Sequence, residues 1–88
     1  MFYTYVLSVE KGGKKRSYIG STSNLKKRIL EHYNNTTQTT KNYDKIVLIY
    51  YEACLNKTDA IIREHQLKTG FGRDYLKRRM KHYSAGLV

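Results

Sequence analysis

The hydrophobic positions near the start of the chain follow the period of two that is typical of a strand. Between Phe2 and Val9 every odd position is large and largely apolar, whereas the even positions are mixed. This alternation predicts a strand with one well-buried face. Residues 10–15 include Gly12-Gly13, which accept positive φ easily, and a second strand from Arg16 to Gly20 follows. The two strands are therefore expected to form an antiparallel hairpin.

After Gly20 the pattern becomes helical. Ser21, Thr22, Ser23 and Asn24 are all residue types that cap helices, and a helix is expected from about Asn24 to Tyr33. Its apolar stripe consists of Leu25, Ile29 and Leu30.

The same helix carries candidate chemistry. Arg28 and His32 are four residues apart and therefore share a face, while Tyr18 lies just upstream on the strand. The strand–helix corner thus collects a phenol, a guanidinium and an imidazole. An arginine can hold phosphate oxygens, and tyrosine and histidine can move protons, so this grouping suits a phosphate substrate.

The middle of the chain alternates between a polar segment and an apolar one. Asn34 to Asn42 is polar and aperiodic, which predicts a mobile loop beside the corner. Asp44 to Glu52 contains a β-branched and apolar run at 46–51. Because both faces of this run are apolar, we expect a central or doubly covered strand.

Two helices are predicted in the last third of the chain. The segment 56–59 opens a helix, with Thr58 as the expected cap, that runs to about Lys68. Gly70 to Gly72 is expected to be a hinge-like turn before a basic helix from residue 73 or 74 to Tyr83. Residues 1–83 are predicted to form one domain and residues 84–88 a short frayed tail.

Charge and cysteine content narrow the class of protein. The 88 residues include 17 Lys and Arg against seven Asp and Glu, a formal charge of +10, which favours nucleic acid as the partner. A ribosomal-type or membrane-surface protein would carry similar charge. Cys54 is the single cysteine, and no signal peptide or membrane span is visible, so we expect a reducing, cytoplasmic location. The cations expected to contact the nucleic-acid backbone are Lys11, Lys14, Lys15, Lys26, Lys27, Lys77, Arg78 and Lys81.

Glu64 is an acid on an apolar helix stripe. At 100° per residue it falls in the middle of the arc that Ala60, Ile61 and Leu67 form. A carboxylate there is costly unless a cation pairs with it. Two interpretations are open: a structural ion pair with Arg or Lys, or a ligand for a hard divalent cation such as Mg²⁺, which often uses only one or two carboxylates.

These segments together resemble the GIY-YIG nuclease superfamily. Tyr3-Thr4-Tyr5 stands on the first strand, Tyr18-Ile19-Gly20 on the second, and residues 24–32 and Glu64 follow at the family's spacing. The likeness covers about residues 3–83 and is strongest to small stand-alone members, which resemble the nuclease domain of the bacterial excinuclease and structure-selective resolvases. It implies an α+β GIY-YIG fold with a central three-stranded antiparallel sheet flanked by helices.

The resemblance also implies a function and a set of roles. The family cuts phosphodiesters with one divalent metal, here Mg²⁺ or Mn²⁺ held by Glu64. Arg28 matches the transition-state arginine, His32 a position that is His or Tyr in members, and Tyr5 and Tyr18 the two motif tyrosines. We expect Tyr5 to act as the base and Tyr18 to orient the water. Since a phenol has a pKa near 10, a tyrosine that acts as the base needs its pKa lowered by Arg28, the metal or His32.

The chain departs from the family pattern at three positions. Tyr3 replaces the first glycine, Ser21 replaces a lysine of the excinuclease branch, and Leu76 stands where several members have an asparagine. The main prediction is a metal-dependent DNA endonuclease of weak sequence specificity with a role in repair or recombination, acting as a monomer or weak dimer. Single-stranded, duplex and branched DNA are all open, and RNA is less expected. The alternatives are an inactive nucleic-acid-binding module of the same fold and a basic RNA-binding protein with a fortuitous match.

Overall fold

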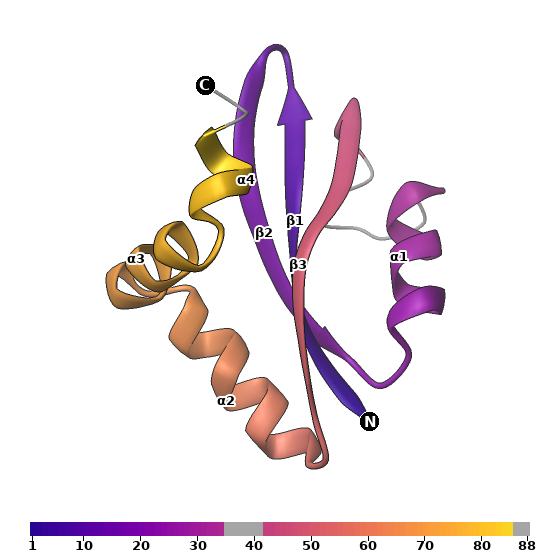
Figure 1. Cartoon of the computed structure of the whole chain (residues 1–88). Coiled ribbons are helices and arrows are strands. Elements are labelled where there is room, and N and C mark those ends of the chain that lie inside the picture. The colour runs from indigo at the N-terminus through magenta and orange to yellow at the C-terminus, as the bar shows by residue number, and fades with distance from the viewer. Residues whose placement is uncertain (35–41, 86–88) are drawn as a thin grey trace.

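The chain folds around one antiparallel sheet. The structure, a computed structural model, describes residues 1–34 and 42–85. Three strands pair in the order β2-β1-β3, with α1 on one side of the sheet and α2, α3 and α4 on the other (Figure 1). This confirms the predicted α+β class and its three-stranded sheet. The elements are β1 Phe2–Lys11, β2 Lys14–Thr22, α1 Leu25–Tyr33, β3 Lys45–Cys54, α2 Lys57–Leu67, α3 Gly70–Arg79 and α4 Lys81–Ala85.

The hairpin between β1 and β2 closes through two glycines. Lys11 stands opposite Lys14, so Gly12 and Gly13 alone form the turn, with φ of 58° and 79°. Both residues occupy the left-handed region that side chains disfavour and that matches the twist of a two-residue hairpin. The predicted antiparallel hairpin is confirmed.

Strand β1 is the centre of the sheet and is covered on both faces. Thr4, Tyr5, Val6 and Leu7 are consecutive and all buried. Tyr5 and Leu7 belong to a core cluster with Ile29 of α1, whereas Val6 belongs to a second cluster on the α2–α3 side. The prediction of a single buried face is therefore wrong, because helices cover both sides of this strand.

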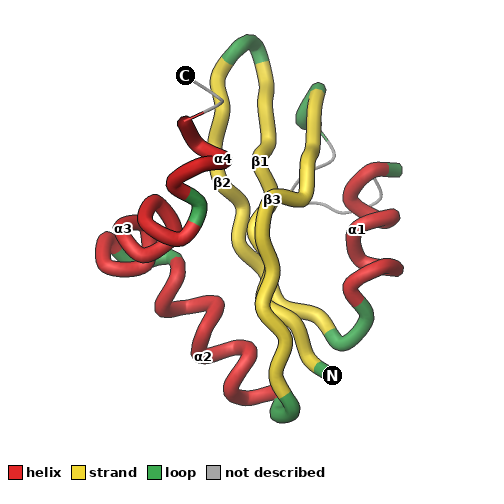
Figure 2. Tube along the Cα trace, viewed as in Figure 1, coloured by secondary structure: helices red, strands yellow, loops and turns green. Residues whose placement is uncertain are grey.

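Strand β3 lies at an edge of the sheet (Figure 2). Of the two predicted alternatives, a central strand is therefore wrong, whereas a strand covered on both faces agrees with the packing. The register shifts between Val6 and Leu7, whose partners are Tyr50 and Leu48. Because this irregularity adds one residue to β3, Leu48 packs on the α1 side and Tyr50 on the α2–α3 side. Apolar residues on both faces thus reflect two core clusters beside an edge strand.

The caps of the first two helices are both asparagines. Asn24 accepts from the backbone N–H of Lys27 at 3.1 Å and begins α1 as expected. For α2 the cap is Asn56, whose side chain accepts from the N–H groups of residues 58 and 59, so the prediction of Thr58 is wrong. On α1, Leu30 is exposed rather than part of the buried stripe, and His32 is buried instead.

Helix α3 begins at Gly70, earlier than predicted, with Thr69 as its cap. Gly70 to Gly72 therefore form its first turn and not a hinge. A Cβ at Gly72 would collide with the backbone of Gln66 and Leu67, so this glycine lets α3 start directly against the end of α2.

The predicted final helix is interrupted. The chain leaves helical geometry at Met80, and α4 follows as a separate short helix that takes in the first two residues of the predicted tail. The rest of that tail, 86–88, and most of the predicted loop, 35–41, lie outside the described residues. Within the described part of the chain no helix has the length and apolarity needed to cross a bilayer.

Candidate active site

Two buried side chains form the centre of the site. Tyr5 of β1 is 1 % exposed and His32 of α1 is 0 % exposed. The Tyr5 hydroxyl lies 3.0 Å from His32 Nε2, and the two rings meet edge to face with centroids 5.7 Å apart. A strand residue and a helix residue that are 27 positions apart in the chain are thereby joined by one hydrogen bond.

Arg28 completes a chain of hydrogen bonds with this pair. Its Nε donates to the Tyr5 hydroxyl oxygen at 3.4 Å, and its guanidinium also contacts Glu31 Oε1 at 3.5 Å. Burial and the Arg28 charge lower the pKa of His32, so the imidazole is neutral near pH 7 and can accept a proton. In the tautomer that carries its proton on Nδ1, His32 Nε2 accepts the phenol proton of Tyr5 while Arg28 donates to the phenol oxygen.

The protein's own groups raise the pKa of Tyr5, so Arg28 and His32 do not supply the expected lowering. Burial is the largest cause, and the hydrogen bond from Arg28 opposes it without outweighing it. A phenolate at Tyr5 is therefore disfavoured in the protein as it stands. Glu64 contributes to the same upward shift, which places its charge within electrostatic reach of Tyr5.

The second motif tyrosine packs against the first pair. Tyr18 of β2 is half-buried, and its ring centroid lies 6.3 Å from that of Tyr5 and 5.3 Å from that of His32. Gly20 stands opposite Tyr5 in the sheet. A Cβ on Gly20 would lie 2.5 Å from the Tyr5 hydroxyl, so the glycine is the residue that makes room for this ring.

Glu64 of α2 is half-buried rather than enclosed by the core, and Ser21, which lines a hollow beside Arg28, is one of its hydrogen-bond partners. Its carboxylate is 2.7 Å from Lys68 Nζ. Burial raises its pKa, but hydrogen bonds from Lys68 and Ser21 outweigh burial and lower it overall, so the group is ionised. Of the two interpretations left open by the sequence, the ion pair is present in the structure.

The same carboxylate fits the donor set of one hard divalent cation. Within residues 1–34 and 42–85 no group of three or more His, Cys, Asp or Glu side chains could hold a metal ion. Mg²⁺ needs no such group, since it commonly binds through one or two carboxylates and completes its shell with water and phosphate oxygens. Glu64, ionised and hydrogen-bonded through Ser21, meets that requirement.

An open polar hollow of about 530 Å³ adjoins Arg28. It lies at the junction of β2 and α1, where Ser21, Lys27 and Glu31 also line it. Sequence reasoning overlooked Ser21 as a partner of Glu64 and Glu31 as a partner of Arg28. The spacing of Arg28 and Glu31, one helix turn apart, was the available signal for the second of these.

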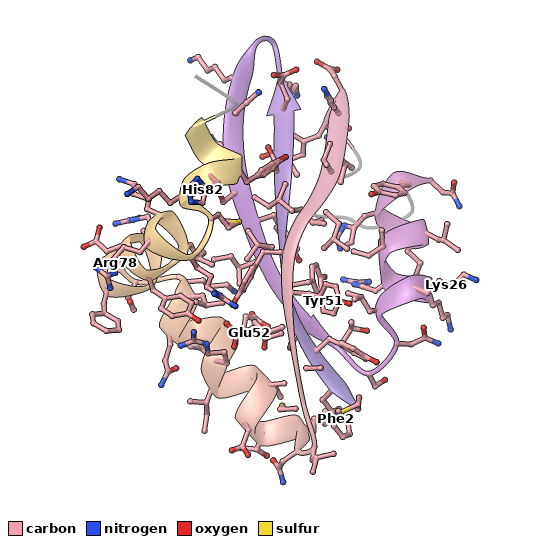
Figure 3. The ribbon with its side chains drawn as sticks, in the orientation of Figure 1. Phe2, Lys26, Tyr51, Glu52, Arg78 and His82 are labelled. Atoms are coloured by element: carbon pink, nitrogen blue, oxygen red, sulfur yellow. The ribbon has the colours of Figure 1, made fainter. Side chains whose placement is uncertain are left out.

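The predicted backbone-binding cations are exposed and lie in separate regions. Three are on the hairpin, two on α1 and three on α3 and α4. On α1, Lys27 lines the hollow, whereas Lys26 lies on the side of the helix away from the sheet (Figure 3). The three groups are Lys11, Lys14 and Lys15; Lys26 and Lys27; and Lys77, Arg78 and Lys81.

Leu76, the residue at the position of the family's late asparagine, is part of the core. It is buried with Val6, Ile19 and Leu67 on the α2–α3 side of the sheet. It therefore takes no part in the hydrogen-bond chain of Tyr5, Arg28 and His32, which lies on the α1 side.

Comparison with known proteins agrees with this geometry. No curated protein and no solved structure matches the chain significantly. A family model described as the GIY-YIG catalytic domain matches residues 1–80. The chain therefore belongs to the GIY-YIG family, whose catalytic domain is that of endonucleases acting on DNA.

Proposed function

We propose that this protein is a divalent-metal-dependent endonuclease that hydrolyses phosphodiester bonds in DNA. The observation that carries the proposal is the hydrogen-bond chain from Arg28 through Tyr5 to His32, beside a polar hollow that opens at Arg28. A neutral imidazole, a phenol and a guanidinium in this order can move a proton and hold a phosphate at one place.

Arg28 is assigned to the phosphate. Its contacts with Tyr5 and Glu31 are long, at 3.4 and 3.5 Å, and 35 % of its side chain is exposed. The guanidinium can therefore turn toward the hollow and donate to the non-bridging oxygens, where negative charge develops during hydrolysis.

Tyr5 and His32 are assigned to the proton. A water molecule gives its proton to the Tyr5 oxygen as the phenol proton passes to His32 Nε2. The resulting hydroxide attacks phosphorus as the bond from phosphorus to the leaving oxygen breaks. The tyrosine is never ionised in this relay, so its raised pKa is no obstacle. The relay requires the water to reach the phenol oxygen past Arg28, whose contact there is loose. We assign Tyr18, on the neighbouring strand, to orient that water.

Glu64 is assigned to hold one Mg²⁺ or Mn²⁺ ion. When bound, such an ion supplies Lewis-acid stabilisation of the leaving oxygen. The carboxylate must first exchange Lys68 for the metal, since Lys68 lies 2.7 Å away.

The substrate is proposed to be DNA chosen by structure or strandedness more than by sequence, in repair or recombination. The net charge of +10 supports binding through phosphates, which carries no base information. The free thiol of Cys54 suits a cytoplasmic setting, and we propose a monomer or weak dimer.

The second candidate is a nucleic-acid-binding module that does not cut. The observation favouring it is the Lys68–Glu64 ion pair, which satisfies the carboxylate without any metal. The hydrogen-bond chain at Tyr5 favours the nuclease, because a binding surface has no use for a buried tyrosine–histidine relay.

Cleavage assays with a matched pair of variants separate the two. Labelled single-stranded, duplex and branched DNA would be incubated with Mg²⁺, Mn²⁺ or EDTA. We expect metal-dependent cutting that falls at least about 10²-fold in Glu64→Gln while DNA binding persists. Asp59→Asn is the control, since this exposed residue on the same helix loses the same charge. Cutting in EDTA, or full cutting by Glu64→Gln, would contradict the proposal, and binding without cutting under any metal would favour the module.

A further inference from the structure

A second hollow, separate from the site, lies between the hairpin and α3. Its volume is about 500 Å³. Lys15 and Arg16 of β2 form one wall, and Arg73 and Lys77 of α3 contribute the other. Arg73 and Lys77 are four residues apart and so project from one face of the helix. We call this hollow the β2–α3 groove.

The groove is cationic without acidic compensation. The remaining residues that line it are serines and aliphatic or thioether side chains, including Ile19 and Leu76, and no carboxylate is among them. Glu10 stands opposite Lys15 in the sheet, but the ion pairs among the described residues involve Arg28, Arg63 and Lys68 and none of the four groove cations. Four uncompensated charges around one groove repel each other unless an anion binds there.

Strand β2 connects the groove to the site. Ser17 and Ile19 line the groove, and Ser21, two residues further on, lines the hollow beside Arg28. As β2 is an edge strand, its outer side is open to a ligand that passes from one hollow to the other. From Lys15 to Ser21 the strand spans about 20 Å, or about six base-pair steps of duplex DNA.

We propose that the β2–α3 groove binds the sugar–phosphate backbone of the same DNA that is cut at Arg28, about six steps from the scissile bond. This inference rests on the proposed function. The groove has no aromatic side chain among its lining residues, so it lacks a platform for stacking bases. It therefore contacts phosphates and sets the position of the substrate, not its sequence.

The test compares two double variants that each remove two positive charges. Lys15→Ala with Lys77→Ala removes two groove cations. Lys45→Ala with Arg79→Ala removes two exposed cations from β3 and α3. Neither Lys45 nor Arg79 lines the groove, and neither is among the cations expected to contact the nucleic-acid backbone.

Binding would be measured by fluorescence anisotropy in EDTA, so that no cleavage is needed. For the groove variant we expect Kd for a duplex to rise about 10- to 100-fold near 0.1 M salt, and the slope of log K against log[salt] to fall by about 1.8. The control variant is expected to change Kd less than a few-fold. Equal losses in both variants would overturn the proposal, because general charge would then explain binding. Displacement of the DNA by polyglutamate at an equal concentration of charge would also overturn it, and would favour an acidic protein partner.

A length series connects the groove to the cut. With wild-type protein and metal, duplexes that extend at least about six base pairs beyond the cut should be cleaved faster at limiting concentration than duplexes extending about three. The groove variant should erase that difference. Groove-dependent binding in EDTA with no cleavage under any metal would defeat the proposed nuclease and leave the groove standing. Cleavage that does not depend on duplex length would support the proposed nuclease and overturn the proposal for the groove.

Discussion

Two clusters of the same side-chain types lie on opposite faces of the sheet, and only one is arranged for chemistry. Each contains two tyrosines, an arginine and a glutamate. The α1-side cluster also contains a histidine. Its members are Tyr5, Tyr18, Arg28, Glu31 and His32, and those of the α3-side cluster are Tyr50, Glu52, Arg63 and Tyr75.

The arginines differ in how fully their donors are used. Arg63 makes two contacts of 3.0 Å with the two oxygens of Glu52, and it lies 4.5 Å from the centre of the Tyr75 ring. Such a bidentate pair between β3 and α2 holds the helix against the sheet. Arg28 has only long contacts and opens on a hollow. Arg63 therefore stabilises the fold, whereas Arg28 is positioned to bind a ligand.

The tyrosines differ in where their protons go. Tyr50 donates to Glu52 at 2.7 Å. Burial, Tyr75 and Glu52 together hold the pKa of Tyr50 well above its usual range. Burial alone would raise the pKa of Glu52, but hydrogen bonds from Arg63 and Tyr50 lower it overall, so this acceptor stays ionised and takes no proton. Tyr5 is hydrogen-bonded instead to a neutral imidazole, which can take a proton. The presence of His32 is therefore what distinguishes the proposed proton relay on the α1 side from a hydrogen-bond network that passes no proton on the α3 side.

The largest expected effect comes from removing one hydroxyl from each cluster. Tyr5→Phe deletes the relay and should lower the single-turnover cleavage rate by about 10²- to 10⁴-fold. Tyr50→Phe removes a hydroxyl of the same kind from the other face and should leave that rate within a few-fold of wild type. A comparable rate loss in both variants would mean that the hydroxyl matters only through folding, which thermal melts of both would reveal.

The next largest effect is expected from substituting the two arginines, which should separate a role in cleavage from a role in stability. Arg28→Lys keeps the charge but loses the planar fork, so cleavage should fall by about 10²- to 10³-fold with little change in Tm. Arg63→Lys breaks the bidentate pair and should lower Tm while the rate per folded molecule is retained. If Arg63→Lys cut as slowly as Arg28→Lys, the α3-side cluster would have to be part of the reaction.

The strand–helix corner was predictable because its signals are local. A period of two, a Gly-Gly turn, an asparagine cap and the four-residue spacing of Arg28 and His32 all act within one or two turns of chain. These features placed Tyr5, Tyr18 and Arg28 on the right elements without knowledge of their neighbours.

The predictions that failed concern features that are set by contacts between distant segments of the chain. The pKa of Tyr5 is set by burial under a helix from elsewhere in the chain, and nothing near Tyr5 in sequence indicates the extent of that burial. Gly70 and Gly72 predicted a hinge-like turn, whereas they lie in the first turn of α3, and Gly72 leaves room for the backbone of α2 that lies against it. The α3-side cluster was not anticipated at all, since its four members come from three different elements.

A moderate effect is expected from neutralising the glutamates. Glu52→Gln leaves Arg63 half-buried without its carboxylate and should cost about 1–3 kcal/mol in the free energy of unfolding. Glu31→Gln weakens, among the interactions of Glu31, a long contact to a partly exposed arginine, and this contact should account for about 0–1 kcal/mol. Urea denaturation of both variants measures the difference. Equal losses in the free energy of unfolding would show that the two arginines are held equally tightly, which their contact distances do not predict.

The smallest effect is a pH dependence that distinguishes the clusters. The pKa of His32 lies below its ordinary 6.5 because of burial and Arg28. The unfolded chain therefore binds more protons in the window between the two values, and stability rises with pH across it. The contribution of His32 is complete above about pH 6.5 and is lost as pH falls through the lowered pKa.

Glu52 acts in a lower window. Its pKa is depressed from 4.5, so its contribution is present above that value and is lost as pH falls through the depressed pKa. Unfolding by urea between about pH 7.5 and 3 should thus lose stability in two stages. His32→Gln should remove the first stage and leave the second. Glu52→Gln should leave the first stage and reduce the second, to which Glu64 also contributes. A first stage that survives in His32→Gln would mean that a group outside the α1-side cluster titrates there, and the neutral imidazole would lose its support as the acceptor of the Tyr5 proton.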